Sequence, residues 1–551
     1  MRPRVDLVVE GRIATLAGTD GYGWVEAIAV AGGRVVAAGR AADVDALPGA
    51  GRAHRLALEP DEAVVPGLTD AHLHLADGGL AAGLLDLAAT PSLEAALVEI
   101  AAADSRLPPG AWLEGHGWDV DRWGGWPTAV ALERAAPARP IAIWAHDHHA
   151  LWVSTAALAI AGVDRGTPDP PGGLIRRRPD GAPSGILHEA AARLATARIR
   201  APTADECERD IAALAARLVR LGVVAVHDPG GLSLQGGLGP AFEAYGRLAD
   251  RGALPLAVHV CVREEQLDAA VEAGLRSGDP LDRSGASRLM LGWLKLFADG
   301  TLGSRTAALL EPIEREAGRP LPPGTERGVW MTPPERLAEL ARRAADHGIA
   351  CQVHAIGDHA VRAALDALSP TVGRVPLAPR VEHVQLVDPA DLARFAGAGI
   401  AASVQPIHLR SDAAAARRLW GARAERNGYP WASLVRGGAI VAFGTDAPVE
   451  PIDPWPGLEM AATRRSPDWP AGTSTFGPAE RLDLAAALRA QCIGGPASAR
   501  QADRGRLVPG SRADLVVVPA AALGEPVEPG GPLGTARPRL VLVDGRVAAE
   551  A

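Results

Sequence analysis

Two histidines separated by one residue, His72 and His74, are the clearest chemical signal in this chain of 551 residues. They follow an apolar run that begins at Val64, and Pro66-Gly67 and Thr69-Asp70 indicate that a strand ends here and opens into a loop. Side chains two residues apart on a strand point to the same face, so both imidazoles can reach one divalent cation. The alternative is two surface or core histidines that share this spacing by chance.

The middle of the chain shows a repeated β-then-α order, which would position such a site. Candidate helices, for example 203–221 and 334–347, separate short apolar runs. With the strand that precedes His72, the predicted strands number eight, the others being 140–145, 222–228, 289–297, 348–354, 380–384, 399–405 and 438–443. This order predicts an α/β fold, a (β/α)8 TIM barrel, with a doubly wound open sheet as the competing topology.

Polar side chains that could bind a cation lie at or near the C-terminal ends of these predicted strands. They are His72, His74, Lys295, His354, His383 and Asp446. In a barrel the C-terminal strand ends converge on one pocket, so we expect these residues to form a single site.

Both ends of the chain have the alternating pattern of β-strands, in runs such as 5–9, 27–30, 514–518 and 540–547. They predict a small β-sandwich domain built from residues 1–60 and 503–551 around a barrel domain of residues 61–502.

The stretch from about 76 to 140 is longer than one βα connection requires, and it contains Trp112, Trp118, Trp123 and Trp126. We interpret it as an insertion that forms a lid over the barrel mouth, in which the tryptophans line a pocket for an apolar substrate. A separate small hydrophobic core is the alternative interpretation.

Composition excludes several classes of protein. The net charge of −9 shows no basic excess, which argues against a nucleic-acid partner. The four cysteines are scattered and form no CxxC pair, and no apolar run is long enough to cross a membrane. The N-terminus lacks the apolar segment of a secretory signal. We therefore expect a soluble cytoplasmic protein that binds a small-molecule substrate and could form a homodimer.

Five motifs, in this order, resemble the amidohydrolase superfamily, in particular the amidohydrolase 3 branch that contains N-substituted formamide deformylases. They are PGLTDAHLH at 66–74, KLFADGTLGSRTA at 295–307, HAIGD at 354–358, VEHVQ at 381–385 and GTDAP at 444–448. The end segment 505–517 is similar to the return of that family's chain to its β-sandwich. The resemblance covers nearly the whole chain and implies a metal-dependent hydrolase of carbon–nitrogen bonds.

The resemblance also implies the roles of the candidate residues. His72, His74, His354 and His383 would be metal ligands, and Asp446 would contact the metal and act as general acid and base. This donor set suits one or two Zn²⁺ ions, although Mn²⁺, Fe²⁺ or Ni²⁺ can occupy a similar shell. A bound cation lowers the pKa of its water from about 15.7 toward 7, which supplies the nucleophile.

Lys295 is unusual in such a set because an ammonium group repels a cation. Resemblance to the binuclear members of the superfamily implies that CO₂ carboxylates this amine and makes it a bridging ligand. A plain Lys295 that binds substrate beside one metal ion is the alternative. The catalytic residues implied are thus Asp446, Lys295 and His354, which would help to stabilise the oxyanion.

Further residues are candidates for binding substrate. Relatives carry an Asp-x-His-x-x-Trp pattern that matches Asp147, His149 and Trp152, and the neighbouring His146 and His148 would donate hydrogen bonds to substrate or loops. The predicted substrate-binding set is His149, Trp152, Trp118, Asp299 and Arg305. Asp228 and Asp299 could also orient ligands, or could simply cap turns.

The sequence supports one leading function and two alternatives. The leading one is hydrolysis of a non-peptide carbon–nitrogen bond in an amide, a formamide or an N-acyl compound. A deaminase or a cyclic-amide hydrolase would use the same activated water, and the fold does not choose between them. A metal-binding regulatory protein without turnover is the alternative of another class.

Overall fold

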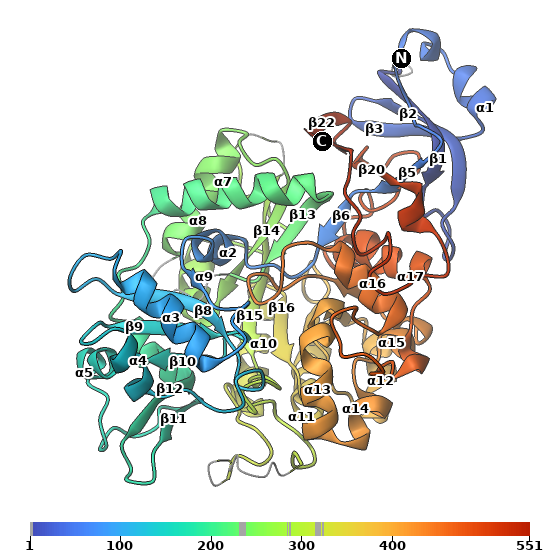
Figure 1. The fold of residues 1–551 in the computed structure, drawn as a ribbon. Coiled ribbons are helices and arrows are strands. Elements are labelled where there is room, and N and C mark those ends of the chain that lie inside the picture. Colours follow the sequence, from blue (N-terminus) through green and yellow to red (C-terminus); the bar gives the residue numbers. More distant parts are fainter. Residues whose placement is uncertain (1–3, 231–237, 284, 286–287, 315–320, 322–323) are drawn as a thin grey trace.

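The computed structural model describes residues 4–230, 238–283, 285, 288–314, 321 and 324–551. Three sheets organise this part of the chain: one made from both chain ends, a central parallel sheet and a mixed sheet inserted after the first central strand. In Figure 1 the sheet of the chain ends lies at one side of the molecule, and the inserted sheet, in light blue and teal, lies at the opposite side of the central one.

The central sheet is a nearly closed barrel of parallel strands. In order around the barrel they are β6 (Leu68–Asp70), β13 (Val223–Asp228), β14 (Ala257–Arg263), β15 (Leu289–Phe297), β16 (Cys351–Ala355), β17 (Arg380–His383), β18 (Ala401–Val404) and β19 (Val441–Phe443). The backbone N–H of Ala71, just past β6, donates to the carbonyl of Phe443 at 2.9 Å, so the first and last strands lie side by side. The predicted barrel is thereby confirmed over the open sheet.

One predicted barrel strand was wrong. Residues 140–145 do form a strand, β9 (Ile141–Ala145), but it pairs with its neighbours in the inserted sheet. The place in the barrel belongs to β14, which pairs with β13 and β15. The alternating apolar residues of β14 were a visible signal, yet β9 is equally apolar, and only the tertiary pairing separates the two.

Helices cover the outside of the barrel strands. They are α7 (Ala204–Arg220), α8 (Gly239–Asp250), α9 (Leu267–Glu272), α10 (Pro334–Asp346), α11 (Asp358–Leu368), α12 (Pro389–Ala398), α13 (Leu409–Trp420), α14 (Ala422–Asn427), α15 (Trp431–Arg436), α16 (Trp455–Thr463), α17 (Leu484–Arg489) and α18 (Gly495–Ser498). The two helices that the sequence predicts are confirmed as α7 and α10. Helix α7 begins with a capping box, in which Thr203 and Glu206 satisfy each other's backbone N–H groups.

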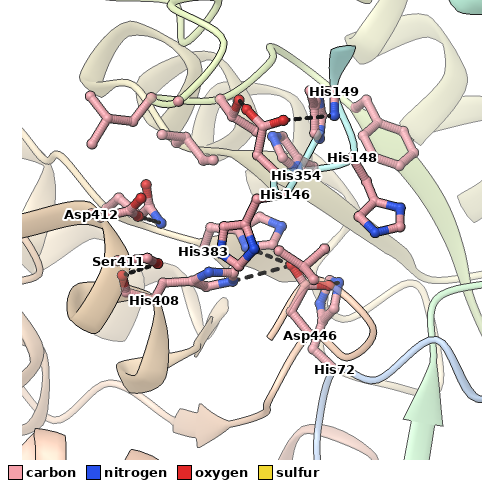
Figure 2. Close-up of a pocket in the computed structure, with 18 of the residues that line it drawn as sticks. His72, His146, His148, His149, His354, His383, His408, Ser411, Asp412 and Asp446 are labelled. Carbon is pink, nitrogen blue, oxygen red and sulfur yellow. Dashed lines mark hydrogen bonds and ion pairs between the residues drawn. The ribbon is translucent and has the colours of Figure 1, made fainter. Parts of the chain in front are cut away.

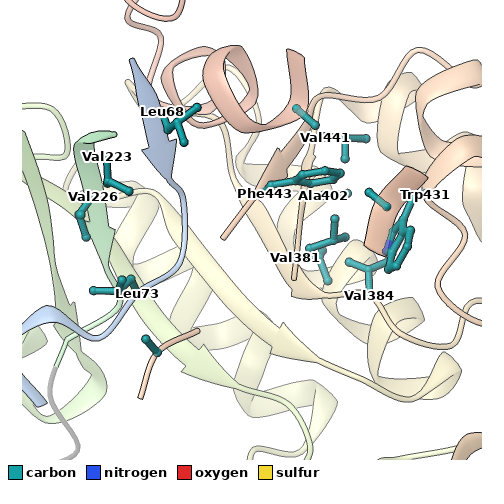
Figure 3. Close-up of a cluster of buried hydrophobic side chains, with 14 of the residues drawn as sticks. Leu68, Leu73, Val223, Val226, Val381, Val384, Ala402, Trp431, Val441 and Phe443 are labelled. Atoms are coloured by element: carbon teal, nitrogen blue, oxygen red, sulfur yellow. The ribbon is translucent and has the colours of Figure 1, made fainter. Parts of the chain in front are cut away.

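The strands and helices share the largest hydrophobic cluster of the described chain. Figure 3 shows Val223 and Val226 of β13 on one side of this core, and Val381, Phe443 and Trp431 on the other. The strands are apolar on both faces because helices cover the outside of a parallel barrel, so alternation is lost. None of the described helices has the length and the apolar character needed to cross a membrane.

The sheet of the chain ends pairs strands from both termini. Its strands are β1 (Leu7–Ala14), β2 (Trp24–Ala31), β3 (Arg34–Gly39), β4 (His54–Ala57), β5 (Glu62–Pro66), β20 (Leu515–Pro519), β21 (Leu540–Val543) and β22 (Arg546–Glu550), with α1 (Ala41–Asp45) beside them. Strand β5 joins the two halves, because it pairs with β20 and then leads directly into the barrel strand β6. Residues on one face of these strands form a cluster of their own, which includes Ile28, Val64 and Leu515.

The inserted sheet spans residues 85–189. Its strands are β7 (Leu85–Asp86), β8 (Leu113–Trp118), β9, β10 (Ala150–Val153), β11 (Gly173–Arg177) and β12 (Pro183–Glu189), and its helices are α3 (Leu93–Asp104), α4 (Ala129–Ala135), α5 (Thr155–Ala161) and α6 (Arg193–Thr196). Helix α2 (Leu75–Ala81) connects the barrel to it. The insertion continues well past residue 140, and it packs around two hydrophobic clusters of its own.

Candidate metal centre

The histidines and the aspartate predicted as ligands lie at the C-terminal end of the barrel. His72 and His74 follow β6, and Asp446 follows β19, the strand beside it. The backbone N–H of Asp446 donates to the carbonyl of His72 at 2.7 Å, and that of His74 donates to Ala447 at 2.9 Å. Gly444 permits this close approach, because a Cβ there would lie 2.5 Å from the nitrogen of His72. The two ligand-bearing segments are thus held against each other by their backbones.

Two of the candidate ligands have unusual backbone conformations. The φ angle is +73° at His383 and +59° at Asp446, in the left-handed region that non-glycine residues rarely adopt. Such strain persists only where the surrounding structure enforces it, and it concentrates at functional sites. At the ends of β17 and β19 it turns both side chains toward the barrel axis, where Figure 2 shows them facing each other.

His72, His383 and Asp446 form a compact set of donors. One ligand atom from each lies within 4.8 Å of the others, a spacing suited to a shared cation. His383 Nδ1 is buried and has no hydrogen-bond partner among the described residues, although it lies 3.9 Å from Asp446 Oδ2. A buried nitrogen without a partner costs free energy unless something binds it, and a metal ion would do so. Two imidazoles and a carboxylate therefore fit a divalent metal ion.

The other candidates surround this set. His74 Nε2 lies 3.3 Å from Asp446 Oδ1, and Lys295 Nζ lies 3.4 Å from His72 Nε2. The ring of His354 is 4.4 Å from that of His383, centroid to centroid, while its Nε2 contacts the carbonyl of Gly300 at 3.1 Å. The structure therefore brings all six predicted ligands into one site.

A buried ion pair contacts His72 at Nδ1, the ring nitrogen that faces away from the candidate metal position. His72 Nδ1 lies 2.5 Å from Glu382 Oε2, and Arg380 Nε donates to Glu382 Oε1 at 2.9 Å. Arg380 also donates to the carbonyl of Ala71 at 2.6 Å and to Ser403 at 2.7 Å. Arg380 and Glu382 are two residues apart on β17, so both point into the barrel. Their contacts orient His72 so that its Nε2 faces Asp446 and Lys295.

Burial sets the protonation of the site. It lowers the pKa of His72 to about 4, with help from the nearby Lys295 ammonium, and it lowers those of His354 and His383 well below the usual value. These imidazoles are therefore neutral at pH 7, the form that binds a metal. Burial opposes ionisation of Asp446, but the interaction with His72 and the hydrogen bond from His408 hold the pKa of Asp446 well below its ordinary value.

A cavity opens above these residues. His72, His74, Lys295, His354, His383 and Asp446 form its floor, and His146, His148, His149 and Asp412 belong to its walls (Figure 2). A second recess, lined by Trp118 and Trp126 among others, adjoins this cavity, and His146, Asp147 and Asp412 line both spaces. A substrate bound over the metal centre can therefore extend past these shared residues.

The predicted substrate-binding residues lie in different places. His149 lines the cavity, where its Nδ1 contacts Glu189 at 2.6 Å, and Trp118 lines the recess. Among the described residues that line these two spaces, Trp152, Asp299 and Arg305 do not occur.

Each of those three residues has a structural partner instead. Trp152 is fully buried in the core of the insertion and donates to the carbonyl of Thr128 at 3.0 Å. Asp299 accepts backbone N–H groups from Ala308, Ile356 and Gly357 at 2.7–3.1 Å, and it therefore holds the loops around His354. Arg305 binds Asp121 at 2.6 Å. These contacts account for the positions of the three residues, and their role in binding substrate stays a prediction.

Three residues that contact the site were not predicted from the sequence. His408 Nε2 lies 3.2 Å from Asp446 Oδ2, Glu382 contacts His72, and Glu450 accepts from His146 at 3.2 Å. His408 follows the end of β18, so the strand-end rule that found His383 could have found it. Glu382 lies in the VEHVQ motif at 381–385, beside the predicted ligand His383, but the motif did not show which residue it would contact. Glu450 carried no comparable signal, because its partner is distant in sequence.

Comparisons with known proteins agree with this geometry. A family model described as "Amidohydrolase family" matches residues 61–549. The putative amidohydrolase YtcJ of Bacillus subtilis is 30% identical over 82% of this chain and 83% of its own length. The N-substituted formamide deformylase of Arthrobacter pascens is 27% identical over 90% of each chain. The structure of an uncharacterised metal-dependent hydrolase from Pyrococcus horikoshii superposes with a TM-score of 0.71, at 26% identity over 93% of this chain and 97% of that one.

Proposed function

This chain belongs to the amidohydrolase family, and on that basis we propose that it hydrolyses a non-peptide carbon–nitrogen bond in a small amide, formamide or N-acyl compound. The observation that carries the proposal is the set of His72, His383 and Asp446, whose ligand atoms lie within 4.8 Å of one another at the floor of a cavity. The resemblance to a formamide deformylase over 90% of each chain supports this choice of bond.

We propose Zn²⁺ as the metal, because neutral imidazoles and a carboxylate are its typical ligands. His72, His74, His383 and Asp446 would hold it, with His354 beside them. Bound there, the ion supplies Lewis acidity, which polarises a carbonyl group and makes water acidic enough to lose a proton near neutral pH. The buried Glu382 keeps the Nε2 atom of His72 directed at this position.

Asp446 is placed to move the proton. Its pKa is held well below the ordinary value, so the carboxylate is ionised at neutral pH and can accept a proton from the attacking water. The water oxygen bonds to the carbonyl carbon, the carbon–nitrogen bond breaks, and Asp446 returns the proton to the leaving nitrogen. The products are a carboxylic acid and an amine. His408, at 3.2 Å from Asp446 Oδ2, holds the carboxylate during both transfers.

We also propose that Lys295 carries a carboxylate made by reaction with CO₂. The side chain is 2% exposed, and burial lowers the pKa of its amine to about 8. A lowered pKa raises the fraction of neutral amine, which is the form that attacks CO₂. The position of Nζ beside His72 Nε2 would let such a group join the donor set.

The test combines metal analysis with a substrate screen. The purified enzyme is loaded with Zn²⁺, and release of amine or ammonia is measured from formamides, N-acyl amino acids, lactams and aminated heterocycles. Turnover of the open-chain amides with bound zinc, lost on chelation and restored by zinc, is the expected result. Turnover of only the aminated heterocycles would replace this proposal with a deaminase.

A further inference from the structure

The passage between the catalytic cavity and the tryptophan-lined recess contains a polar pair that the hydrolytic steps above do not use. His146 and Asp412 line both spaces, and they come from different parts of the chain, His146 following β9 and Asp412 lying on α13. Figure 2 shows both side chains in the wall around the metal centre. A substrate that reaches from the metal centre into the recess would therefore meet residues that line both spaces, His146 and Asp412 among them.

His146 is held in one orientation with one nitrogen left for a ligand. Its Nε2 lies 3.2 Å from Glu450 Oε1, and because a carboxylate only accepts, this nitrogen donates. Glu450 is buried and is fixed in turn by the hydroxyl of Ser411 at 2.6 Å. No hydrogen-bond partner of His146 Nδ1 is found within the described chain, and the side chain lines the cavity.

His146 is a cationic donor under ordinary conditions. Burial opposes its charge, but the hydrogen bond and the charge of Glu450, together with Asp119 and Asp147, raise the pKa of His146 to about 9. At pH 7 the imidazole therefore carries both protons, so Nδ1–H is available as a donor at the wall of the cavity. It can donate to an oxygen atom of a bound molecule.

Asp412 offers the complementary acceptor. Its Oδ2 accepts the hydroxyl of Tyr429 at 2.8 Å and the amide of Gln385 at 3.0 Å, which fix the carboxylate. The other oxygen, Oδ1, has no partner among the residues that the structure describes, and Asp412 lines both spaces. Burial raises the pKa of Asp412 to about 6, so the group is mostly ionised at pH 7 and accepts an N–H.

The charge around the passage selects against an anion. Asp119, Asp121, Asp147 and Asp412 line the recess, and Asp121 is paired with Arg305 and Arg418, which lie outside its described lining. The positive charge of His146 is already matched by Glu450. A carboxylate in the substrate would place a second negative charge beside the ionised Asp412, while a neutral group would gain the donor and the acceptor without that repulsion.

We propose that His146 and Asp412 bind a neutral carboxamide-type group of the substrate, located outside the bond that is cleaved. His146 Nδ1–H donates to the carbonyl oxygen of this group, and Asp412 Oδ1 accepts its N–H. The inference rests on the proposed function, because the metal centre must hold the scissile group for the second group to reach the passage. It narrows the substrate class to amides or formamides that carry a second, neutral amide.

The test uses three compounds that differ only at the second group. They are the N-methanesulfonyl derivatives of phenylalanine amide, phenethylamine and phenylalanine. The first carries a carboxamide as its second group, the second carries no second group, and the third carries a carboxylate. The sulfonamide of all three resists hydrolysis. Dissociation constants are measured by calorimetry on the zinc-loaded wild-type enzyme. We expect the carboxamide to bind at least about tenfold more tightly than either of the other two.

Two variants and a matched control assign the preference to this pair. His146→Gln keeps a donor for Glu450 but removes Nδ1–H, and Asp412→Asn turns an N–H toward the cavity because Tyr429 and Gln385 occupy its oxygen. Each should lose the tenfold preference. His116→Gln changes a histidine on β8 that is outside the described lining of both spaces, and it should keep the preference.

The outcomes separate this inference from the proposed function. Equal binding of the carboxamide and the phenethylamine compound, or no measurable binding of either, overturns the inference, as does a preference that survives in both variants. If thermal unfolding shows that His146→Gln is not folded, the result for Asp412→Asn alone decides whether the inference holds. The proposed function is judged separately, by amine release from the corresponding N-formyl compounds, and it fails if none of them is hydrolysed while binding remains intact.

Discussion

Nδ1 of His72 lies 2.5 Å from Oε2 of Glu382, although the two residues are 310 positions apart in the chain. The contact connects the first barrel strand to β17 across the interior, and Arg380 neutralises the carboxylate from its other side. Arg380 and His72 together lower the pKa of Glu382 to about 2 against the opposing effect of burial. The metal site therefore depends on a charged group that does not touch the metal position.

Glu382→Gln tests that dependence. The substitution leaves the guanidinium of Arg380 buried without a counter-charge, a situation that costs about 3–5 kcal/mol. We expect the free energy of unfolding to fall by that amount in denaturant titrations, together with weaker zinc binding because His72 is no longer oriented. A variant with wild-type stability and zinc affinity would show that Arg380 and His72 are held by their other contacts.

Removal of one metal ligand should separate metal loss from unfolding. His383→Ala deletes the imidazole whose Nδ1 has no hydrogen-bond partner in the described chain, so it removes no protein contact at that atom. We expect bound zinc and kcat to fall together while the circular dichroism spectrum is retained. His116→Ala serves as the control, and full zinc content in His383→Ala would remove this residue from the ligand set.

Asp446→Asn tests the proton transfer. The amide keeps the shape of the side chain but cannot take a proton from water, so kcat should fall by at least about 10²-fold, the usual effect of losing a general base. Steady-state kinetics on zinc-loaded enzyme provide the measurement. A normal kcat with only a raised KM would make Asp446 a binding residue.

Lys295→Ala distinguishes a carboxylated lysine from an ordinary one. If the side chain carries a carboxylate, its loss should lower zinc stoichiometry, and short carboxylic acids such as acetate or propionate should restore part of the activity. A lysine that binds substrate as an ammonium would be rescued by small amines instead. Rescue by amines alone, with full zinc content, would contradict the carboxylate.

The pH dependence of stability tests the contact between His146 and Glu450. The pKa of His146 is raised from 6.5 to about 9 in the folded protein, so the folded state retains a proton that the unfolded state loses. The resulting stabilisation is present below about pH 6.5 and is lost as pH rises through 9.

Denaturant titrations of the wild type and His146→Gln provide the measurement. Their difference in unfolding free energy should shrink by on the order of 3 kcal/mol between pH 6 and pH 10. A difference that stays constant over this range would mean that the proton on His146 does not stabilise the fold.

Local patterns in the sequence were sufficient to predict the class of fold and which residues lie together at the candidate site. His72, His354 and Asp446 each follow or close a mainly apolar run, and this pattern identifies a strand end without knowledge of its neighbours. Lys295 lies within its run, and His383 ends the mixed segment Arg380–His383. Parallel strands in a barrel place their C-terminal ends together, so His72, His354, His383 and Asp446 could be assigned to one pocket from their positions in the chain.

The contacts that orient the predicted ligands, and the identity of the further residues that contact the site, depended on the tertiary structure. Strands β9 and β14 are both short and apolar, and pairing between strands, which depends on distant residues, placed β14 in the barrel. Trp152 matched a motif but lies in a hydrophobic core, whereas His408 and Glu450 matched none and contact the site. Glu382 lies in the VEHVQ motif, which did not indicate its contact with His72. The physical reason is that side-chain contacts across the barrel mouth depend on how loops fold over it, and spacing along the chain does not encode that arrangement.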